Sequence, residues 1–191
     1  MPDGLEQLNE AATQLKIDLV ALVAATAIWA NPKVHTSLCA QHASGAYFPR
    51  TRRYRTGDSE TRGAFTDTDR LDGNNYANHA IRQAVGIPRA QLTNYHACHI
   101  WPQSCYDSRC HTVVANLVLL PSPLATLSDH HSQVIAALQY RAYKLFSWFP
   151  PNESAPRRPS HYPSNWREPE PFTPRIQASL NARHLEYLER F

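Results

Sequence analysis

The segment spanning residues 92–149 constrains the fold most, because its pattern of apolar residues changes several times within a short length. An apolar run at 96–101 precedes a cysteine-rich loop at 102–110, and a β-branched run at 112–120 precedes a helical pattern. This order predicts strand, loop, strand and helix, with Ser128 at the N-cap of the helix. We therefore expect an α+β fold.

Residues 5–30 predict a long amphipathic helix, because apolar side chains recur there at spacings of three and four. The Asn31-Pro32 step should end this helix, since the helical conformation is disfavoured before proline. The leucine stripe between Leu5 and Leu22 has two potential partners, the core of its own chain or the same helix of a second copy. The second alternative predicts a homodimer.

The remaining segments carry weaker patterns. Residues 33–75 are polar and rich in turn-forming residues, which predicts loops and short strands. A short helix is expected at 76–85, closed by Gly86. Eight of the fifteen prolines fall between residues 150 and 174, so this segment should be an extended linker. A last helix is expected at 176–191.

Length and composition exclude several classes of protein. The 191 residues suffice for one domain with a substantial core. Only 6 residues are glycine, and the sequence contains no glycine-rich phosphate-binding motif of the nucleotide-binding folds. The uncharged run at residues 19–30 is shorter than the roughly 18 residues that span a bilayer. We therefore expect no membrane partner and a cytoplasmic location.

Arginine dominates the basic residues, with 16 Arg and 3 Lys among the 19. Its guanidinium group donates paired hydrogen bonds that match phosphate oxygens and guanine edges. Residues 19–57 contain five basic side chains and no acidic one, which favours an anionic partner such as DNA. The candidate DNA-binding residues are Arg50, Arg52, Arg53 and Arg55. Alternatively, these arginines belong to a solvated loop and pair with nearby acids, namely Asp58, Glu60, Asp67, Asp69 and Asp72.

Histidine and cysteine concentrate at residues 96–131, which hold five of the ten histidines and three of the four cysteines. Such a cluster on a strand-loop-strand-helix unit suits a metal site or an acid–base site. A structural zinc site could combine Cys39 and His42 with Cys105 and Cys110. Alternatively, these thiols are free and packed in the core.

The order of residues within this cluster resembles the HNH endonuclease family. His99 lies in the sequence CHIWP, Asn116 opens NLVLLP after 17 positions, and His130 or His131 lies at the start of a helix. Together with the stretch LQYRAYKLFSWFPP, these motifs are similar to those of bacterial restriction-type HNH endonucleases. The resemblance covers about residues 90–150 and implies a ββα-metal core.

This resemblance divides the chain into three regions. Residues 1–91 would supply the N-terminal helix and an arginine-rich DNA-contacting region. Residues 92–149 would form the ββα-metal core. Residues 150–191 would form a proline-rich arm and the terminal helix.

The resemblance also implies a role for each motif residue. His99 would be the general base that takes a proton from water, and Asn116 would support the loop that carries it. A divalent cation, Mg²⁺ or Mn²⁺, would be bound nearby. Its candidate ligands are His130, Asp129 and Cys98. His131 is the alternative to His130, and Cys98 is either a small packed residue or a ligand for a softer ion.

Two functions of different classes follow from these observations. The first is a metal-dependent endonuclease that hydrolyses duplex DNA, specifically a type II restriction enzyme acting as a homodimer. The second is a non-catalytic DNA-binding module stabilised by zinc. The two differ at His99, because a general base must be free to accept a proton whereas a zinc ligand cannot.

Overall fold

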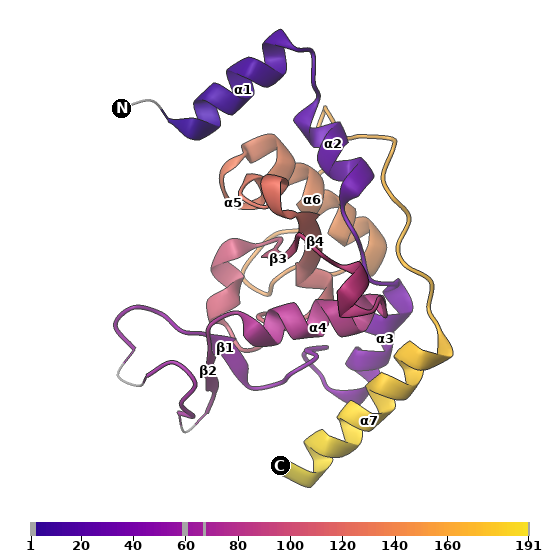
Figure 1. The fold of residues 1–191 in the computed structure, drawn as a ribbon. Helices are drawn as coiled ribbons and strands as arrows, with labels where there is room; N and C mark the ends of the chain where they lie inside the picture. The colour runs from indigo at the N-terminus through magenta and orange to yellow at the C-terminus, as the bar shows by residue number, and fades with distance from the viewer. Residues whose placement is uncertain (1–2, 59–60, 67, 191) are drawn as a thin grey trace.

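The structure is a computed structural model that describes residues 3–58, 61–66 and 68–190. The fold combines α-helices with two separate two-stranded sheets, one at the centre among the helices and one at the edge of the molecule (Figure 1), which confirms the predicted α+β class. The described α-helices are α1 (Gly4–Gln14), α2 (Leu19–Thr26), α3 (Pro32–Gln41), α4 (Asn75–Val85), α5 (Leu127–His130), α6 (Ser132–Phe146) and α7 (Pro174–Arg190). The strands are β1 (Thr51–Arg53), β2 (Arg70–Asp72), β3 (Tyr95–His99) and β4 (Leu117–Pro121). Within the described ranges, no helix has the length and apolarity needed to cross a membrane.

The centre of the molecule is the antiparallel hairpin of β3 and β4, followed in the chain by α5 and α6. The register pairs His99 with Leu117. A turn of 3-10 helix at Val114–Asn116 occupies part of the predicted β-branched strand, so β4 begins later than the sequence pattern indicates. The predicted order of strand, loop, strand and helix is otherwise present.

Both faces of β4 are buried, which explains why its sequence is apolar at every position rather than at alternate ones. Val118 and Leu120 belong to a core cluster shared with α2 and α6. Leu117 and Leu119 belong to a second cluster shared with α3, α4 and α7. The hairpin therefore lies between two layers of helices.

Helix α4 confirms the prediction of a short helix closed by Gly86, which adopts a left-handed conformation with φ of 67°. The residue in its N-cap position, Asn74, makes no capping hydrogen bond with its side chain. Instead, the carboxylate of Asp72 accepts hydrogen bonds from the backbone N–H groups of Asn75 and Tyr76. The end of β2 is thereby fixed to the start of α4.

The prediction of one long N-terminal helix is wrong. Lys16 has a φ of 56°, which breaks the helix after α1, and Asp18 caps a new helix by accepting hydrogen bonds from two backbone N–H groups. The chain then becomes extended, and Ile28 pairs with Leu119 beside the hairpin. The apolar repeat continued across this break because both helices need an apolar face.

Two further expectations about helix ends are also wrong. The Asn31-Pro32 step does not end a helix, since α2 already ends at Thr26. It begins α3 instead, because Asn31 accepts from a backbone N–H and proline suits the first helical position. This places a helix inside the segment expected to hold only loops and short strands. Ser128 does not cap α6, since its hydroxyl donates to the carbonyl oxygen of Ala125. His131 caps α6 instead, through its Nδ1.

The proline-rich segment is extended, as predicted, and contains no helix or strand between residues 151 and 173. It runs along the outside of the molecule between α6 and α7 (Figure 1). Backbone N–H groups of Arg167 and Glu170 donate to the carbonyl oxygens of Ala24 and Trp29. Helix α7 begins at Pro174, and the final residue of the predicted terminal helix, Phe191, lies outside the described residues.

Candidate functional site

A cavity of about 240 Å³ lies between the end of β3 and the segment that leads into α5. Four separate parts of the chain supply its polar lining. These are Arg53 at the end of β1, Asn74 before α4, His96, Cys98 and His99 on β3, and Asp129 on α5. A cation, a carboxylate and histidine nitrogens thus line one small space.

His99 is buried, with only 6% of its surface exposed. Its Nε2 lies 3.0 Å from the carbonyl oxygen of His111, and because a carbonyl oxygen can only accept, Nε2 carries the proton. Burial, with a smaller contribution from the neighbouring His111, lowers the pKa of His99 to about 3. The ring is therefore neutral at physiological pH, and its Nδ1 is the nitrogen that can accept a proton.

His111 connects His99 to Asp72. The two histidine rings are stacked, with centroids 5.1 Å apart and planes inclined by 16°. Nε2 of His111 donates to Oδ2 of Asp72 at 3.0 Å. Burial raises the pKa of Asp72, but the hydrogen bonds from His111 and from the backbone of Tyr76 and Asn75 outweigh this and lower it. Asp72 is therefore an ionised, nearly inaccessible carboxylate.

Asn116 is fully buried and joins the two sides of the loop between β3 and β4. Its Oδ1 accepts from the backbone N–H of Trp101, and its Nδ2 donates to Oγ of Ser104 and to the carbonyl oxygen of Cys110. This arrangement matches the supporting role expected for Asn116, since the loop begins directly after His99.

Cys98 lies beside His99, but its thiol is protonated. Burial raises the pKa of Cys98 to about 11, and its sulfur lies 3.8 Å from the carbonyl oxygens of His96 and Ala125. Since metals bind the thiolate, this environment favours the small packed residue over the metal ligand. Asp129 is the carboxylate that lines the cavity, and its oxygens are of the type that Mg²⁺ prefers.

His130 does not face the cavity that contains His99. With His131, it lines a separate cavity of about 440 Å³ against residues of α1 and the start of α2. Among the described residues, no three histidine, cysteine, aspartate or glutamate side chains converge as ligands for one metal ion. The expected set of His130, Asp129 and Cys98 is therefore not brought together in this structure.

The four candidate zinc ligands, Cys39, His42, Cys105 and Cys110, do not form one group in the described structure. The sulfur of Cys39 contacts Nε2 of His35 at 3.6 Å, and Nδ1 of His42 lies 2.8 Å from Oγ of Ser44. Cys105 and Cys110 are buried free thiols, and burial raises the pKa of both, to about 11 for Cys110. Cys105 and Cys110 therefore match the alternative of free cysteines packed in the core, whereas Cys39 is exposed.

The four candidate DNA-binding arginines have different surroundings. Arg52 forms a two-pronged ion pair with Asp58, at 2.9 and 3.1 Å, and lies 3.6 Å from Asp69. This pairing matches the alternative of arginines neutralised by nearby acids, although Glu60 and Asp67 lie outside the described residues. The guanidinium of Arg55 stacks on Tyr106, and Nε of Arg50 donates to the carbonyl oxygen of Thr68. Of the four, Arg53 is the one that lines the cavity with His99.

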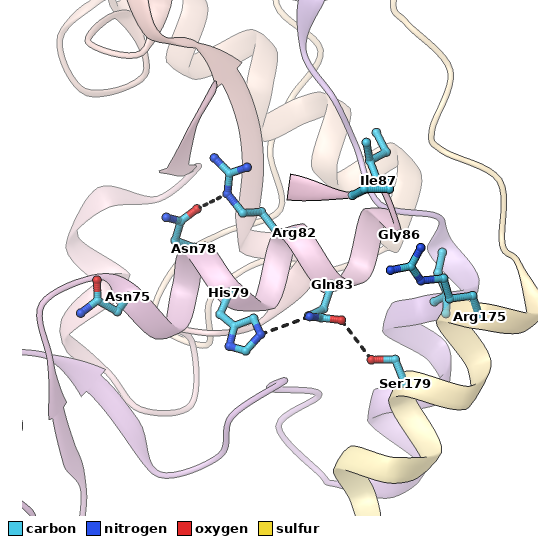
Figure 2. A pocket seen from close by; sticks show the side chains of 11 residues that line it. Asn75, Asn78, His79, Arg82, Gln83, Gly86, Ile87, Arg175 and Ser179 are labelled. Atoms are coloured by element: carbon cyan, nitrogen blue, oxygen red, sulfur yellow. Dashed lines mark hydrogen bonds between the residues drawn. The ribbon is translucent and has the colours of Figure 1, made fainter. Parts of the chain in front are cut away.

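A larger cavity, of about 510 Å³, lies between α4 and α7 (Figure 2), and none of the described side chains that line it is a carboxylate. Arg82 donates to Oδ1 of Asn78 and to two backbone carbonyl oxygens, which ties α4 to the start of β3. Gln83 bridges His79 on its own helix and Ser179 on α7, as Figure 2 shows. Several side chains of this cavity are therefore engaged in hydrogen bonds that hold α4, α7 and β3 together. We place the candidate chemistry at the His99 cavity instead.

Comparison with family models, with curated proteins and with solved structures finds no match to this chain. The function of the site is therefore inferred from its own geometry. Two of its residues, Asp72 and His111, were not singled out as a pair by the sequence. They lie 39 positions apart, and the sole signal was that His111 belongs to the histidine-rich stretch.

Proposed function

We propose that this protein is a metal-dependent endonuclease that hydrolyses phosphodiester bonds in duplex DNA. The observation that carries the proposal is His99, a neutral histidine whose Nε2 is committed to a carbonyl oxygen and whose Nδ1 can accept a proton. It lines the same cavity as a cation, Arg53, and a carboxylate, Asp129. The motif order that resembles HNH endonucleases agrees with this assignment.

In the proposed reaction, Nδ1 of His99 takes a proton from a water molecule as its oxygen attacks phosphorus. The phosphorus–oxygen bond to the leaving group breaks, and the leaving oxygen departs with the electron pair. Arg53 contacts a non-bridging phosphate oxygen, where negative charge develops. The low pKa of His99 applies before substrate binds, and a phosphodiester in the cavity raises the proton affinity of the ring.

Asp129 would hold the divalent cation, Mg²⁺ or Mn²⁺, together with phosphate oxygens and water. A single carboxylate suits Mg²⁺, which is commonly held by one or two carboxylates and by the substrate's own phosphates. The ion would supply charge stabilisation for the leaving oxygen. His130 is not part of this proposal, because it lines a different cavity.

We also propose that the enzyme is a homodimer with a specific recognition sequence, as in type II restriction. Each chain has one His99 cavity, whereas a duplex has two strands to cut, and twofold symmetry supplies two cavities for one site. The second copy would occupy the apolar face of α1 and α2, where three leucines are exposed. These are Leu8, Leu15 and Leu22.

The test is incubation of supercoiled plasmid with the protein in Mg²⁺ or Mn²⁺, with and without EDTA. We expect cutting that EDTA abolishes, and a loss of about 100-fold or more in rate for His99→Ala with DNA binding retained. The matched control is His161→Ala, because His161 is an exposed histidine of the proline-rich arm. DNA binding without cutting under every metal would instead favour the zinc-stabilised, non-catalytic module.

A further inference from the structure

The side chains of Asp72, His111 and His99 form one continuous, buried chain of contacts, with exposed fractions of 4%, 0% and 6%. It links β2, the start of α4 and the loop after β3 to the candidate general base. We propose that Asp72 and His111 are positioning residues, which hold His99 in the one tautomer that leaves Nδ1 open to a proton. This inference rests on the proposed nuclease function.

Asp72 is suited to anchor the chain because three N–H donors converge on its carboxylate. Oδ1 accepts from the backbone of Asn75 at 3.0 Å, and Oδ2 accepts from the backbone of Tyr76 at 2.8 Å and from Nε2 of His111 at 3.0 Å. A carboxylate can accept all three, since it has two acceptor oxygens and no proton to place. An asparagine in its place would present an N–H₂ group to at least one of these donors.

His111 has one available arrangement in this environment. Its Nε2 faces the Asp72 carboxylate and therefore carries a proton. Its Nδ1 is buried and has no hydrogen-bond partner in the described part of the chain. A proton on Nδ1 would be a buried donor without an acceptor, so the Nε2–H tautomer is favoured over the Nδ1–H tautomer.

His111 in turn makes two independent contacts with His99. Its backbone carbonyl accepts from Nε2 of His99, which fixes the tautomer of that ring. Its imidazole stacks on the His99 ring, which fixes the orientation of the ring plane. Because Asp72 holds the His111 ring, a change at Asp72 is transmitted to the ring that performs the proposed proton transfer.

The experiment compares wild type, Asp72→Asn and the matched carboxylate-to-amide control Glu170→Gln, whose carboxylate pairs with Arg167 in the proline-rich arm. Imidazole ¹H–¹⁵N long-range correlation spectra report the tautomer of each histidine, without any need for activity. In wild type we expect the Nε2–H tautomer for both His99 and His111. In Asp72→Asn we expect the ¹⁵N resonances of His111 to shift and the Nδ1–H tautomer to become detectable, because an amide cannot accept from all three N–H donors and its N–H₂ group competes for the position that faces Nε2 of His111.

Single-turnover cleavage provides the second measurement. We expect Asp72→Asn to cut about 10- to 100-fold more slowly with unchanged DNA affinity, and Glu170→Gln to cut like wild type. If Asp72→Asn does not fold, the variant His111→Gln is measured instead. The glutamine amide can still donate to Asp72, but the ring that stacks on His99 is removed. That variant should show the same loss of rate with retained binding.

The outcomes separate the two proposals. A wild type that does not cut DNA overturns the nuclease proposal, and the spectra alone then decide whether Asp72 sets the tautomer of His111. A wild type that cuts, with an Asp72→Asn variant whose spectra and cleavage rate are unchanged, overturns the positioning role and leaves the nuclease proposal intact.

Discussion

Oδ1 of Asn116 accepts a hydrogen bond from the backbone N–H of Trp101 at 3.1 Å, which joins the end of the loop that follows His99 to its beginning. The amide nitrogen of the same side chain donates to Ser104 and Cys110. Three partners thus depend on one fully buried side chain.

Replacing Asn116 with leucine should lower the free energy of unfolding by about 3 kcal/mol, because several buried polar groups lose their partners together. Urea denaturation measures this change. Asn165→Leu is the control, since Asn165 is exposed and its Nδ2 donates to the carbonyl oxygen of Ala21, so the loss should stay below about 1 kcal/mol. Equal losses in the two variants would contradict the bridging role of Asn116.

Gly86→Ala should destabilise the protein by about 2 kcal/mol, through a left-handed backbone and a steric contact. A Cβ at Gly86 would lie 2.8 Å from Cγ1 of Ile176 on α7. Gly63→Ala is the matched control, because its φ is also positive, at 91°, but no atom lies within 4 Å of the added Cβ. Thermal denaturation of both variants separates the cost of the left-handed backbone from the cost of the steric contact with Ile176. A Gly86 variant no less stable than the Gly63 variant would argue against close packing of α7 on Gly86.

Acid should destabilise the fold below about pH 6.5 because two histidines are buried in neutral form. Burial lowers the pKa of His35 to about 4 and that of His99 to about 3, whereas both titrate near 6.5 when unfolded. Between these values the unfolded chain binds more protons, so the free energy of unfolding falls as the pH falls. Above pH 6.5 these groups make no contribution to the pH dependence.

Melting temperatures measured from pH 7 to pH 4 test this expectation. His35→Gln should lose less stability over that range, relative to its own value at pH 7, because one of the two buried histidines is removed. Parallel curves for wild type and variant would show that His35 is not held neutral by the fold.

Arg53→Ala should reduce the single-turnover rate of DNA cleavage by about 100-fold, because it removes the cation that lines the His99 cavity. Arg52→Ala should have a small effect on that rate, since Arg52 is paired with Asp58. Binding measured against salt concentration completes the comparison. Similar cleavage rates in the two variants would place the phosphate contact elsewhere.

Changing Leu8 and Leu15 to glutamate should convert the proposed dimer to a folded monomer that nicks duplex DNA or fails to cut it. The two side chains are 39% and 69% exposed in the single chain, so the changes should not unfold it. Light scattering should give wild type twice the mass of the variant, whose mass should be near 21.6 kDa. A wild-type mass near 21.6 kDa with DNA bound would exclude the dimer.

The local patterns of the sequence determined much of the secondary structure. The changes in apolar pattern within residues 92–149 predicted two strands and the following helix, and Gly86 marked the end of α4, because turn and strand preferences act over a few neighbouring residues. The same patterns could not predict the break at Lys16, since a left-handed residue between two helices leaves the apolar repeat unchanged. They also failed to predict α3, because an Asn-Pro step fits the end of a helix as well as the start of one.

The candidate site was decided by the tertiary structure. The resemblance to HNH endonucleases proposed His99 as a base and Asn116 as a support for its loop, but it did not predict that His99 contacts His111 of the loop, which in turn contacts Asp72 of β2. Spacing along the chain also failed to show that Arg53 lies in the cavity while Arg52 is paired, or that His130 faces another cavity. Such contacts join residues distant in sequence, and only the packing of the hairpin against its two layers of helices fixes which side chains meet.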